Sequence, residues 1–239
     1  MRVILPEAVS NEIATKGVYE LDFTLALIQL LEPGMVFFDI GAHRGYFSLL
    51  ASRLVGDNGQ VHAFEPTPET FLLLSQNVQL RQNVSCNNLA VYSESKELTF
   101  NDFGIWAPAF NSIYAPRMSK DTAAKIPVKV RKVQATSVDD YVERSGVKPD
   151  LIKIDAESAE MDILKGMSRT LKSLRPSFTL ETGDEDIEGV ASTKELIEFA
   201  CSFGYTPINI IGGTVTRHQI QDRYGYGNLL FVASELIRN

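Results

Sequence analysis

The feature that most constrains the fold is a buried apolar run that ends in a glycine turn. Residues 36–48 read Val-Phe-Phe-Asp-Ile-Gly-Ala-His-Arg-Gly-Tyr-Phe-Ser, which predicts a strand, a tight turn and then a helix. The next apolar run, 61–64, ends at the acid Glu65. Strand, glycine turn, helix, second strand and carboxylate are typical of a βαβ nucleotide-binding unit. Its glycines let a ligand approach the backbone, and its carboxylate binds ribose hydroxyls.

The turn argues against a dinucleotide. The fingerprint G-x-G-x-x-G holds a pyrophosphate with its glycines and a helix N-terminus. Here Asp39 stands at the first glycine position, and Gly41 and Gly45 follow. A carboxylate repels phosphate but attracts the ammonium and sulfonium groups of S-adenosylmethionine, whose ribose suits Glu65. Asp39 could instead only cap the helix, but capping does not explain Glu65. The turn therefore predicts S-adenosylmethionine.

Length and charge fit one enzyme domain over residues 1–239. The chain has 239 residues, enough for one α/β domain with a large core. Its net charge is −7 and no cluster of lysine and arginine stands out. That balance argues against nucleic acid and against an anionic membrane surface as partners.

Cysteine use and hydropathy predict a cytoplasmic protein. Cys86 and Cys201 lie far apart, and neither belongs to a C-x-x-C motif, so both are expected to be buried free thiols in a reducing compartment. The apolar run at the N-terminus is too short for a signal peptide. No segment reaches the roughly 20 apolar residues of a membrane span.

Strand and helix signals alternate along the chain. Strands are expected at 35–40, 60–64, 84–90, 151–154, 177–180, 206–210 and 228–233. Helices are expected at 22–31, 46–54, 67–80 (with Thr67 as N-cap), 137–143, 159–174 and 193–203. A glycine loop at 212–213, rather than a helix, joins the last two strands, so the final strand should be antiparallel. The pattern predicts a mostly parallel seven-stranded sheet with helices on both faces, in the doubly wound class.

Residues 97–133 interrupt this alternation. Extra strands are expected at 97–101 and 128–133, and a long connection rich in Gly, Pro, Ala, Asn and aromatic residues lies between them. Connections of this length usually carry a function or are disordered, and we interpret 101–127 as a lid over the substrate. The lid holds four irregularly spaced aromatic residues, which could face an acceptor or pack a small core of their own: Phe103, Trp106, Phe110 and Tyr114.

Acidic residues follow several strands of the predicted sheet. In sheets of this class the ligand binds beyond the carboxyl ends of the strands. Five acids are expected at that edge: Asp39, Glu65, Asp155, Glu157 and Glu181. A single acid there is often only a cap or a solvated charge. A row of them suits a cationic cofactor and could also hold a divalent metal with oxygen ligands.

Four motifs, in order, resemble the FkbM family of S-adenosylmethionine-dependent methyltransferases. They are Asp-Ile-Gly-Ala-His-Arg-Gly-Tyr at 39–46, Phe-Glu-Pro at 64–66, Asn-Leu-Ala-Val at 88–91 and Lys-Ile-Asp-Ala-Glu-Ser-Ala-Glu at 153–160. Gly-Val-Tyr-Glu at 17–20 is similar to an N-terminal segment of the family, here part of an N-terminal segment and helix at 1–34. The likeness covers about residues 17–233. It implies the Rossmann-like class I methyltransferase fold.

The resemblance also implies roles for individual residues. Asp39, Gly41 and Gly45 would lie at the methionine end of the cofactor, Glu65 at the ribose, and Pro66 and Ala90 near the adenine. The full set of expected cofactor contacts is Tyr19, Asp39, Gly41, Ala42, Gly45, Tyr46, Glu65, Pro66, Ala90 and Asp155. Ser158 stands where the family usually has Gly. If that position needs a positive φ, serine is strained there, whereas serine is an acceptable N-cap if the position opens a helix.

The implied reaction is methyl transfer to a hydroxyl of a sugar, polyketide or other secondary metabolite. The acceptor must lose a proton, which requires a general base or a metal. The candidate catalytic residues are Asp155, Glu157 and His218, and Asp155 with Glu181 could hold Mg²⁺. Transfer to nitrogen or carbon on the same fold, and a non-catalytic nucleotide-binding scaffold, are the alternatives.

Overall fold

The main sheet brings the predicted strands together in a mixed order. The computed structural model describes residues 1–104, 108, 111–114, 127–184, 186–211 and 214–236. The strand order is β10-β9-β11-β8-β7-β1-β2-β3. The strands are β1 (Val36–Ile40), β2 (Gln60–Phe64), β3 (Val84–Asn87), β7 (Leu151–Ile154), β8 (Ser177–Thr182), β9 (Tyr205–Ile211), β10 (Thr214–Arg217) and β11 (Gly227–Ala233). β11 runs antiparallel to β8 and β9. The other strands from β8 to β3 in this order, which are β8, β7, β1, β2 and β3, all run parallel to one another.

The class I fold predicted from the sequence is confirmed, with one strand more in the described residues. All seven predicted strands are present, and β11 is the antiparallel strand, as expected. The additional strand, β10, pairs with β9 at the edge of the sheet. Its residues Thr-Val-Thr-Arg are all exposed, so they lack the apolar run that marks the buried strands.

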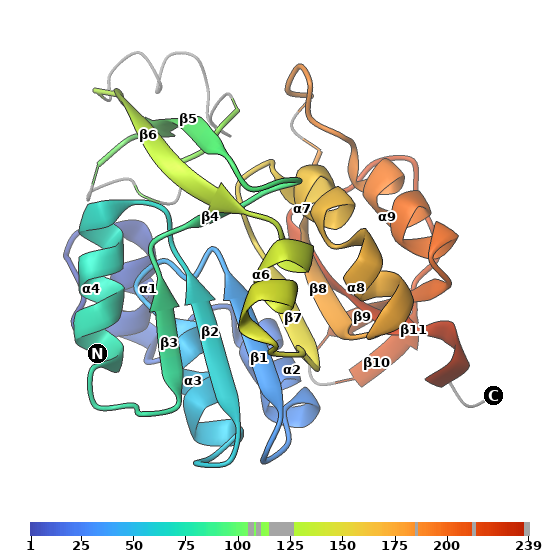
Figure 1. Ribbon diagram of the computed structural model, residues 1–239, viewed down its shortest axis with the longest axis horizontal. Coiled ribbons are helices and arrows are strands. Elements are labelled where there is room, and N and C mark those ends of the chain that lie inside the picture. Colours follow the sequence, from blue (N-terminus) through green and yellow to red (C-terminus); the bar gives the residue numbers. More distant parts are fainter. Residues whose placement is uncertain (105–107, 109–110, 115–126, 185, 212–213, 237–239) are drawn as a thin grey trace.

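Helices cover both faces of this sheet, as Figure 1 shows. Alternate residues of each strand point to opposite faces. Phe38, Ile152 and Phe178 pack into one core with α6, α7, α8 and α9, whereas Phe37 and Val61 pack into the other core with α2 and α3. The helices are α1 (Ala8–Lys16), α2 (Leu21–Leu30), α3 (Tyr46–Leu54), α4 (Pro68–Val78), α6 (Val138–Ser145), α7 (Glu160–Gly166), α8 (Ser168–Ser173) and α9 (Thr193–Ser202).

A second, smaller sheet lies over the carboxyl ends of β1 to β3, at the top of Figure 1. It has the order β4-β6-β5 and consists of β4 (Ala90–Val91), β5 (Glu97–Asp102) and β6 (Lys129–Thr136). The two extra strands expected from the sequence are therefore confirmed. The single strand expected at 84–90 is divided, because β4 leaves the main sheet to pair with β6. Leu98, Phe100 and Val133 give this sheet a core of its own.

Only part of the expected lid at 101–127 is described. Trp106 and Phe110 lie outside the described residues. Asn111 ties the described part to the rest of the fold, because it accepts a hydrogen bond from the Phe103 backbone N–H and donates one to the Thr67 hydroxyl. This segment is thereby fixed to the start of α4, next to the carboxyl end of β2.

The N-terminal helix α1 was not predicted, and a buried ion pair attaches it. Glu7 caps α1, since its carboxylate accepts the backbone N–H groups of Val9 and Ser10. The same carboxylate binds Arg44 of the glycine turn, and both side chains are almost fully buried. The polar sequence of α1 hides this role, because its main anchor is an ion pair rather than an apolar stripe.

Other differences from the sequence are local. The helix expected at 159–174 is two helices, α7 and α8, that meet at Met167. Thr67 occupies the N-cap of α4, as predicted, but its side chain makes no capping hydrogen bond. Cys86 and Cys201 are free thiols, as predicted, although both are only partly buried. Among the described residues, no helix is long and apolar enough to cross a bilayer.

Gly41 allows the ends of β1 and β7 to come together. Its φ is +76°, a left-handed conformation, and a Cβ built on it would lie 1.7 Å from the Asp155 carbonyl oxygen. A Cβ at Gly45, whose φ is +85°, would lie 2.6 Å from Leu74 Cδ1. The close approach at Gly41 involves backbone, which cannot move aside as a side chain can.

Because of this contact, two glycine substitutions should lower the free energy of unfolding by different amounts. Gly41→Ala should lower the free energy of unfolding by about 3 kcal/mol or more, because a left-handed backbone and an overlap with backbone act together. Gly56→Ala is the matched control, since Gly56 also has a positive φ but nothing within 4 Å of its Cβ position. It should cost only about 1 kcal/mol. Denaturant unfolding measures both, and equal losses would contradict the close approach.

Candidate functional site

A cavity of about 650 Å³ opens at the carboxyl ends of β1, β2, β7 and β8. This is the edge at which the sequence placed the row of acids, and the volume is within the usual range for small-molecule sites. Eight of the ten expected cofactor residues line it: Tyr19, Gly41, Ala42, Tyr46, Glu65, Pro66, Ala90 and Asp155. Glu157 and Glu181 also line it, whereas Asp39, Gly45 and His218 do not.

Glu65 is held rigidly at the cavity wall. Its Oε2 accepts the His43 backbone N–H at 3.1 Å, and its Oε1 accepts the Thr67 backbone N–H at 2.9 Å. Burial raises the pKa of Glu65 to about 7, although these hydrogen bonds act in the opposite direction. A carboxylate has about four acceptor positions, so two hydrogen bonds leave capacity for donors on a ligand. Its position between the turn and the start of α4 suits a pair of ribose hydroxyls.

Asp39 lies beneath the turn rather than on the cavity surface. Its side chain is completely buried, and its Oδ2 accepts a hydrogen bond from the Ser48 hydroxyl at 2.5 Å. Burial raises the pKa of Asp39, and the nearby charge of Lys153 opposes that effect. The expected direct contact with the cofactor is therefore not available in this geometry. The cation nearest to Asp39 is a lysine of the protein, 3.9 Å away.

Lys153 is a buried cation that the sequence analysis did not assign to the site. Its Nζ lies 2.8 Å from Asp155 Oδ2 and 5.3 Å from the centre of the Phe47 ring. Burial by itself lowers the pKa of Lys153, but the charges of Asp155, Asp39 and Glu20 raise it overall. The side chain is therefore an ammonium at neutral pH. Two signals could have found this lysine: it interrupts a buried strand, and it is the first residue of the motif at 153–160.

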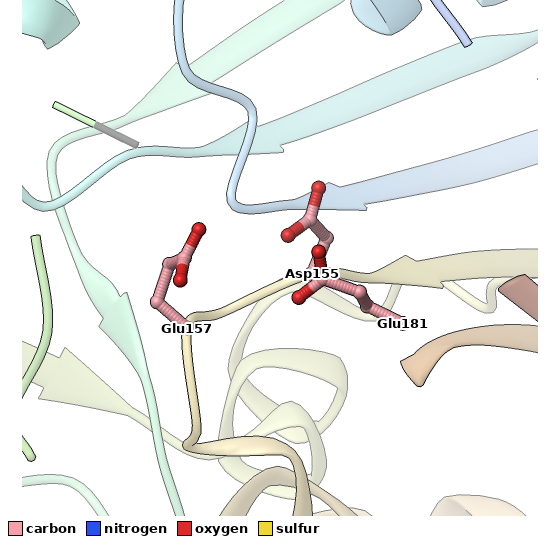
Figure 2. Close-up of side chains that lie close together, drawn as sticks. All are labelled: Asp155, Glu157 and Glu181. Atoms are coloured by element: carbon pink, nitrogen blue, oxygen red, sulfur yellow. The ribbon is translucent and has the colours of Figure 1, made fainter. Parts of the chain in front are cut away.

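Three carboxylates gather at the end of β7 and β8, as Figure 2 shows. Asp155, Glu157 and Glu181 each place one oxygen within 4.8 Å of the others. Glu181 is buried, while Asp155 and Glu157 are partly exposed. The sequence thus predicted correctly that Asp155 and Glu181 come together, and Glu157 joins them. Oxygen donors at this spacing could bind a divalent cation or accept protons.

Strained backbone concentrates around the cavity. Glu20, His43 and Glu157 line it and have positive φ values of 43°, 50° and 47°. Strain of this kind persists where the surrounding structure enforces it, and it is common at functional sites. Ser158 follows Glu157 with φ +83°, while Ala159 is the N-cap of α7. The position where the family usually has Gly therefore does need a positive φ, and the N-cap interpretation of Ser158 is wrong.

The turn that carries Asp155 and Glu157 is supported from two sides. Glu160 accepts a hydrogen bond from the Ala156 backbone N–H at 3.2 Å, and its side chain is buried. On the other side, the Ser112 hydroxyl donates to the Glu157 carbonyl oxygen. These two contacts give Glu160 and the described part of the 101–127 segment a role in fixing the acids.

The structure places His218 away from the candidate site. Its Nδ1 lies 2.7 Å from Asn209 Oδ1 and its Nε2 lies 2.8 Å from the Tyr224 hydroxyl. Both ring nitrogens are thus engaged, one by β9 and the other by the segment between β10 and β11, and the residue does not line the cavity. This placement gives no support to the catalytic role expected for His218, and it could not be foreseen because β10 was not predicted.

The N-terminal segment and the segment before β11 meet across the cavity. The Tyr226 hydroxyl donates to Glu20 Oε1 at 2.6 Å, and the Asn228 amide donates to Glu20 Oε2 at 3.1 Å. Burial, together with the charge of Asp155, raises the pKa of Glu20. Sequence reasoning missed Tyr226, because only the topology brings residue 226 next to residue 20.

Comparisons with known proteins agree with this architecture. The sequence model of the Methyltransferase FkbM domain matches residues 39–207. Hexuronic acid methyltransferase AglP of Haloferax volcanii is 27% identical over 199 residues, which are 80% of this chain and 73% of AglP. The 31-O-demethyl-FK506 methyltransferase FkbM of Streptomyces tacrolimicus is 30% identical over 159 residues, which are 57% of this chain and 61% of that protein.

A solved structure supports the fold. The crystal structure of methyltransferase FkbM from Methylobacillus flagellatus KT superposes with a TM-score of 0.50 at 16% identity. The alignment covers 83% of this chain and 43% of that one, so the present chain spans less than half of its length. The domain match extends over most of the chain and includes the glycine turn, Glu65 and the three carboxylates. The chain therefore belongs to the FkbM family of methyltransferase domains.

Proposed function

We propose that this protein transfers a methyl group from S-adenosylmethionine to a hydroxyl of a small molecule, such as a sugar, a polyketide or another secondary metabolite. The observation that carries the proposal is the cavity that joins the glycine turn and Glu65 to the carboxylates at the end of β7. Family membership supports methyl transfer. The names of two relatives, which specify a hexuronic acid and an O-demethylated FK506, favour an oxygen acceptor.

The residues present fit the cofactor. Gly41 presents bare backbone at the cavity wall, where its contact with the Asp155 carbonyl oxygen admits no side chain, and Glu65 keeps acceptor capacity for ribose hydroxyls. Pro66 and Ala90 would border the adenine, while Tyr19 and Tyr46, whose rings are 6.1 Å apart, would cover the methionine end. Asp39 and Gly45 would act indirectly, by shaping the turn. Carboxylates around the cavity suit a ligand that carries two positive charges.

The chemistry divides between cofactor and chain. S-adenosylmethionine, when bound, supplies a methyl group on a positively charged sulfur that is already activated for in-line displacement. The chain then has to orient the acceptor, exclude water and remove one proton. Asp155 is the best candidate to accept the proton of the acceptor hydroxyl, with Glu157 next to it. Glu181 is the third carboxylate within reach.

Two alternatives keep the same fold. Transfer to nitrogen or carbon would use the same cofactor site and is separated from transfer to oxygen only by the product. A non-catalytic scaffold would have little reason to keep Glu65 and the carboxylates at the end of β7 around one cavity. The described lid residues Pro108, Asn111 and Ile113 line that cavity, which supports a substrate-covering role for 101–127.

Titration of Glu65 should control cofactor affinity. Ribose hydroxyls donate hydrogen bonds, so they need the ionised carboxylate. Because the pKa of Glu65 is about 7, affinity should be nearly full at pH 8 and should weaken as the pH falls through 7, where half of the carboxylates are protonated. Calorimetry with S-adenosylhomocysteine should show a loss of about tenfold between pH 8 and pH 6, following the ionised fraction.

Glu65→Gln is the matched control for that titration. It should bind S-adenosylhomocysteine about ten- to a hundredfold more weakly at pH 8, since a charge-assisted hydrogen bond is worth about 1.5–3 kcal/mol. It should also lose the dependence on pH. A variant that binds as tightly as the parent, or that keeps the same pH dependence, would place the ribose elsewhere.

A divalent metal at Asp155 and Glu181 remains a prediction. Mg²⁺ prefers oxygen ligands and would make a bound hydroxyl more acidic. If a metal acts, activity should vanish after exhaustive treatment with EDTA and return with Mg²⁺, and Glu181→Ala should be nearly as damaging as Asp155→Ala. Full activity after chelation, with no response to added Mg²⁺, would remove the metal and leave Asp155 as the base.

Product mass spectrometry tests the proposed function. The protein is incubated with isotope-labelled S-adenosylmethionine and separate acceptors that offer a neutral sugar, a uronic acid, an amine or a macrocyclic polyol. A labelled methyl ether from the wild-type chain, reduced about 10²–10⁴-fold in Asp155→Asn, is the expected result. A labelled N- or C-methyl product would support the first alternative. Binding of S-adenosylhomocysteine without any labelled product would favour the scaffold.

A further inference from the structure

Lys153 occupies an unusual place for a charged residue. It lies in β7, at the centre of the main sheet, paired in register with Asp39 of β1 and Thr179 of β8. Its side chain is only 3% exposed. A buried ammonium in a parallel sheet is costly unless partners compensate it, so its contacts indicate what it is for.

Those contacts join the two halves of the candidate site. The ammonium makes an ion pair with Asp155 Oδ2 at 2.8 Å. Asp155 is the residue proposed to accept the proton of the acceptor hydroxyl. On the side of the glycine turn, the ammonium lies 3.9 Å from Asp39 Oδ1. That oxygen is buried and has no hydrogen-bond partner among the described residues, so Lys153 supplies its nearest compensating charge. One cation thus serves two carboxylates, one in β1 and one directly after β7.

Lys153 counters the charge repulsion that acts on Asp155 at the ends of β7 and β8. Asp155 has Glu157 and Glu181 within 4.8 Å, and like charges at that distance repel one another. The Asp155 side chain is 21% exposed, so it has room to turn away toward solvent. An ion pair on one oxygen opposes this movement and leaves the other oxygen, Oδ1, free of that contact.

We propose that Lys153 is a positioning residue for methyl transfer, which holds Asp155 by Oδ2 so that Oδ1 receives the proton of the acceptor hydroxyl. This inference rests on the proposed function. In the step, a bond forms between the acceptor oxygen and the methyl carbon as the bond from that carbon to sulfur breaks. The hydroxyl proton passes to Asp155 Oδ1. Lys153 keeps its protons throughout and contributes geometry and charge.

A double-mutant cycle tests whether Lys153 acts through Asp155. The four proteins are the wild type, Lys153→Met, Asp155→Asn and the double variant, compared by kcat at saturating cofactor and acceptor. Lys153→Met alone should lower kcat about a hundredfold, the effect of a misplaced catalytic group. In the Asp155→Asn background the same change should alter kcat less than about threefold, because residues that act as a unit are not additive.

Two outcomes would overturn the proposal. If Lys153→Met lowers kcat by the same factor with and without the Asp155 carboxylate, Lys153 acts independently of Asp155. If kcat per folded molecule is unchanged in Lys153→Met, its role is only structural. Lys148→Met is the matched control, since Lys148 is exposed and lies outside the cavity. It should leave kcat and the melting temperature unchanged.

The experiment also has to allow for a Lys153→Met variant that does not fold. Lys153→Met leaves Asp39 and Asp155 without their ammonium and could unfold, whereas the double variant removes one charge of each sign. If the single variant does not fold, Lys153→Arg replaces it in the cycle, because it keeps a cation but moves the point of contact. The same criterion then holds, with a smaller loss of kcat that must disappear in the Asp155→Asn background.

A structural measurement separates this inference from the proposed function. If the wild-type chain methylates no acceptor, the proposed function fails, and crystal structures of the wild type and of the folded Lys153 variant decide the positioning role. Displacement of the Asp155 carboxylate toward solvent in the variant supports it. An unchanged Asp155 side chain overturns it. Neither result depends on knowing the acceptor.

Discussion

Gly41 passes so close to the Asp155 carbonyl oxygen that only a residue without a side chain fits between the ends of β1 and β7. This contact fixes the distance between the glycine turn, which begins at Gly41, and Asp155, which follows β7. Because β2 and β8 flank these two strands in parallel, Glu65 and Glu181 are brought to the same edge. The close approach of two backbones thus determines where the chemical groups meet.

Charge is the second constraint, and the fold manages it by burial and pairing. Asp39 and Lys153 are placed where water cannot screen them, so each depends on the other and on Asp155. Arg44 of the turn is paired in the same way with Glu7. Glu65 differs, because hydrogen bonds from backbone hold it while burial raises its pKa to about 7. A ligand that donates hydrogen bonds to Glu65 therefore adds to the two that the backbone already provides and stabilises the ionised carboxylate.

The strands, turns and acids of the site could be predicted from the sequence, whereas the pairing of its buried charges could not. The turn at Gly41, the acid after β2 and the acids after β7 are visible because a strand, a turn and a helix each have a local pattern. The pairing of Asp39 with Lys153 was not predicted, because it depends on the register between β1 and β7. The extra strand β10 and helix α1 were missed for a related reason, since neither has the apolar pattern of a buried element.

The walls of the cavity come from different parts of the chain, and this bears on the acceptor. The turn, Glu65 and Asp155 lie within residues 39–207, which match the family domain. Val9 and Ile13 of α1, Glu20 and Tyr226 line the same cavity from outside that range. They add apolar and acidic surface beside the shared motifs. Two relatives of this chain have names that specify acceptors as different as a hexuronic acid and a demethylated FK506. If the family domain carries the proposed reaction, the choice of acceptor has to be sought in the walls that the N-terminal segment and the segment before β11 add to the cavity.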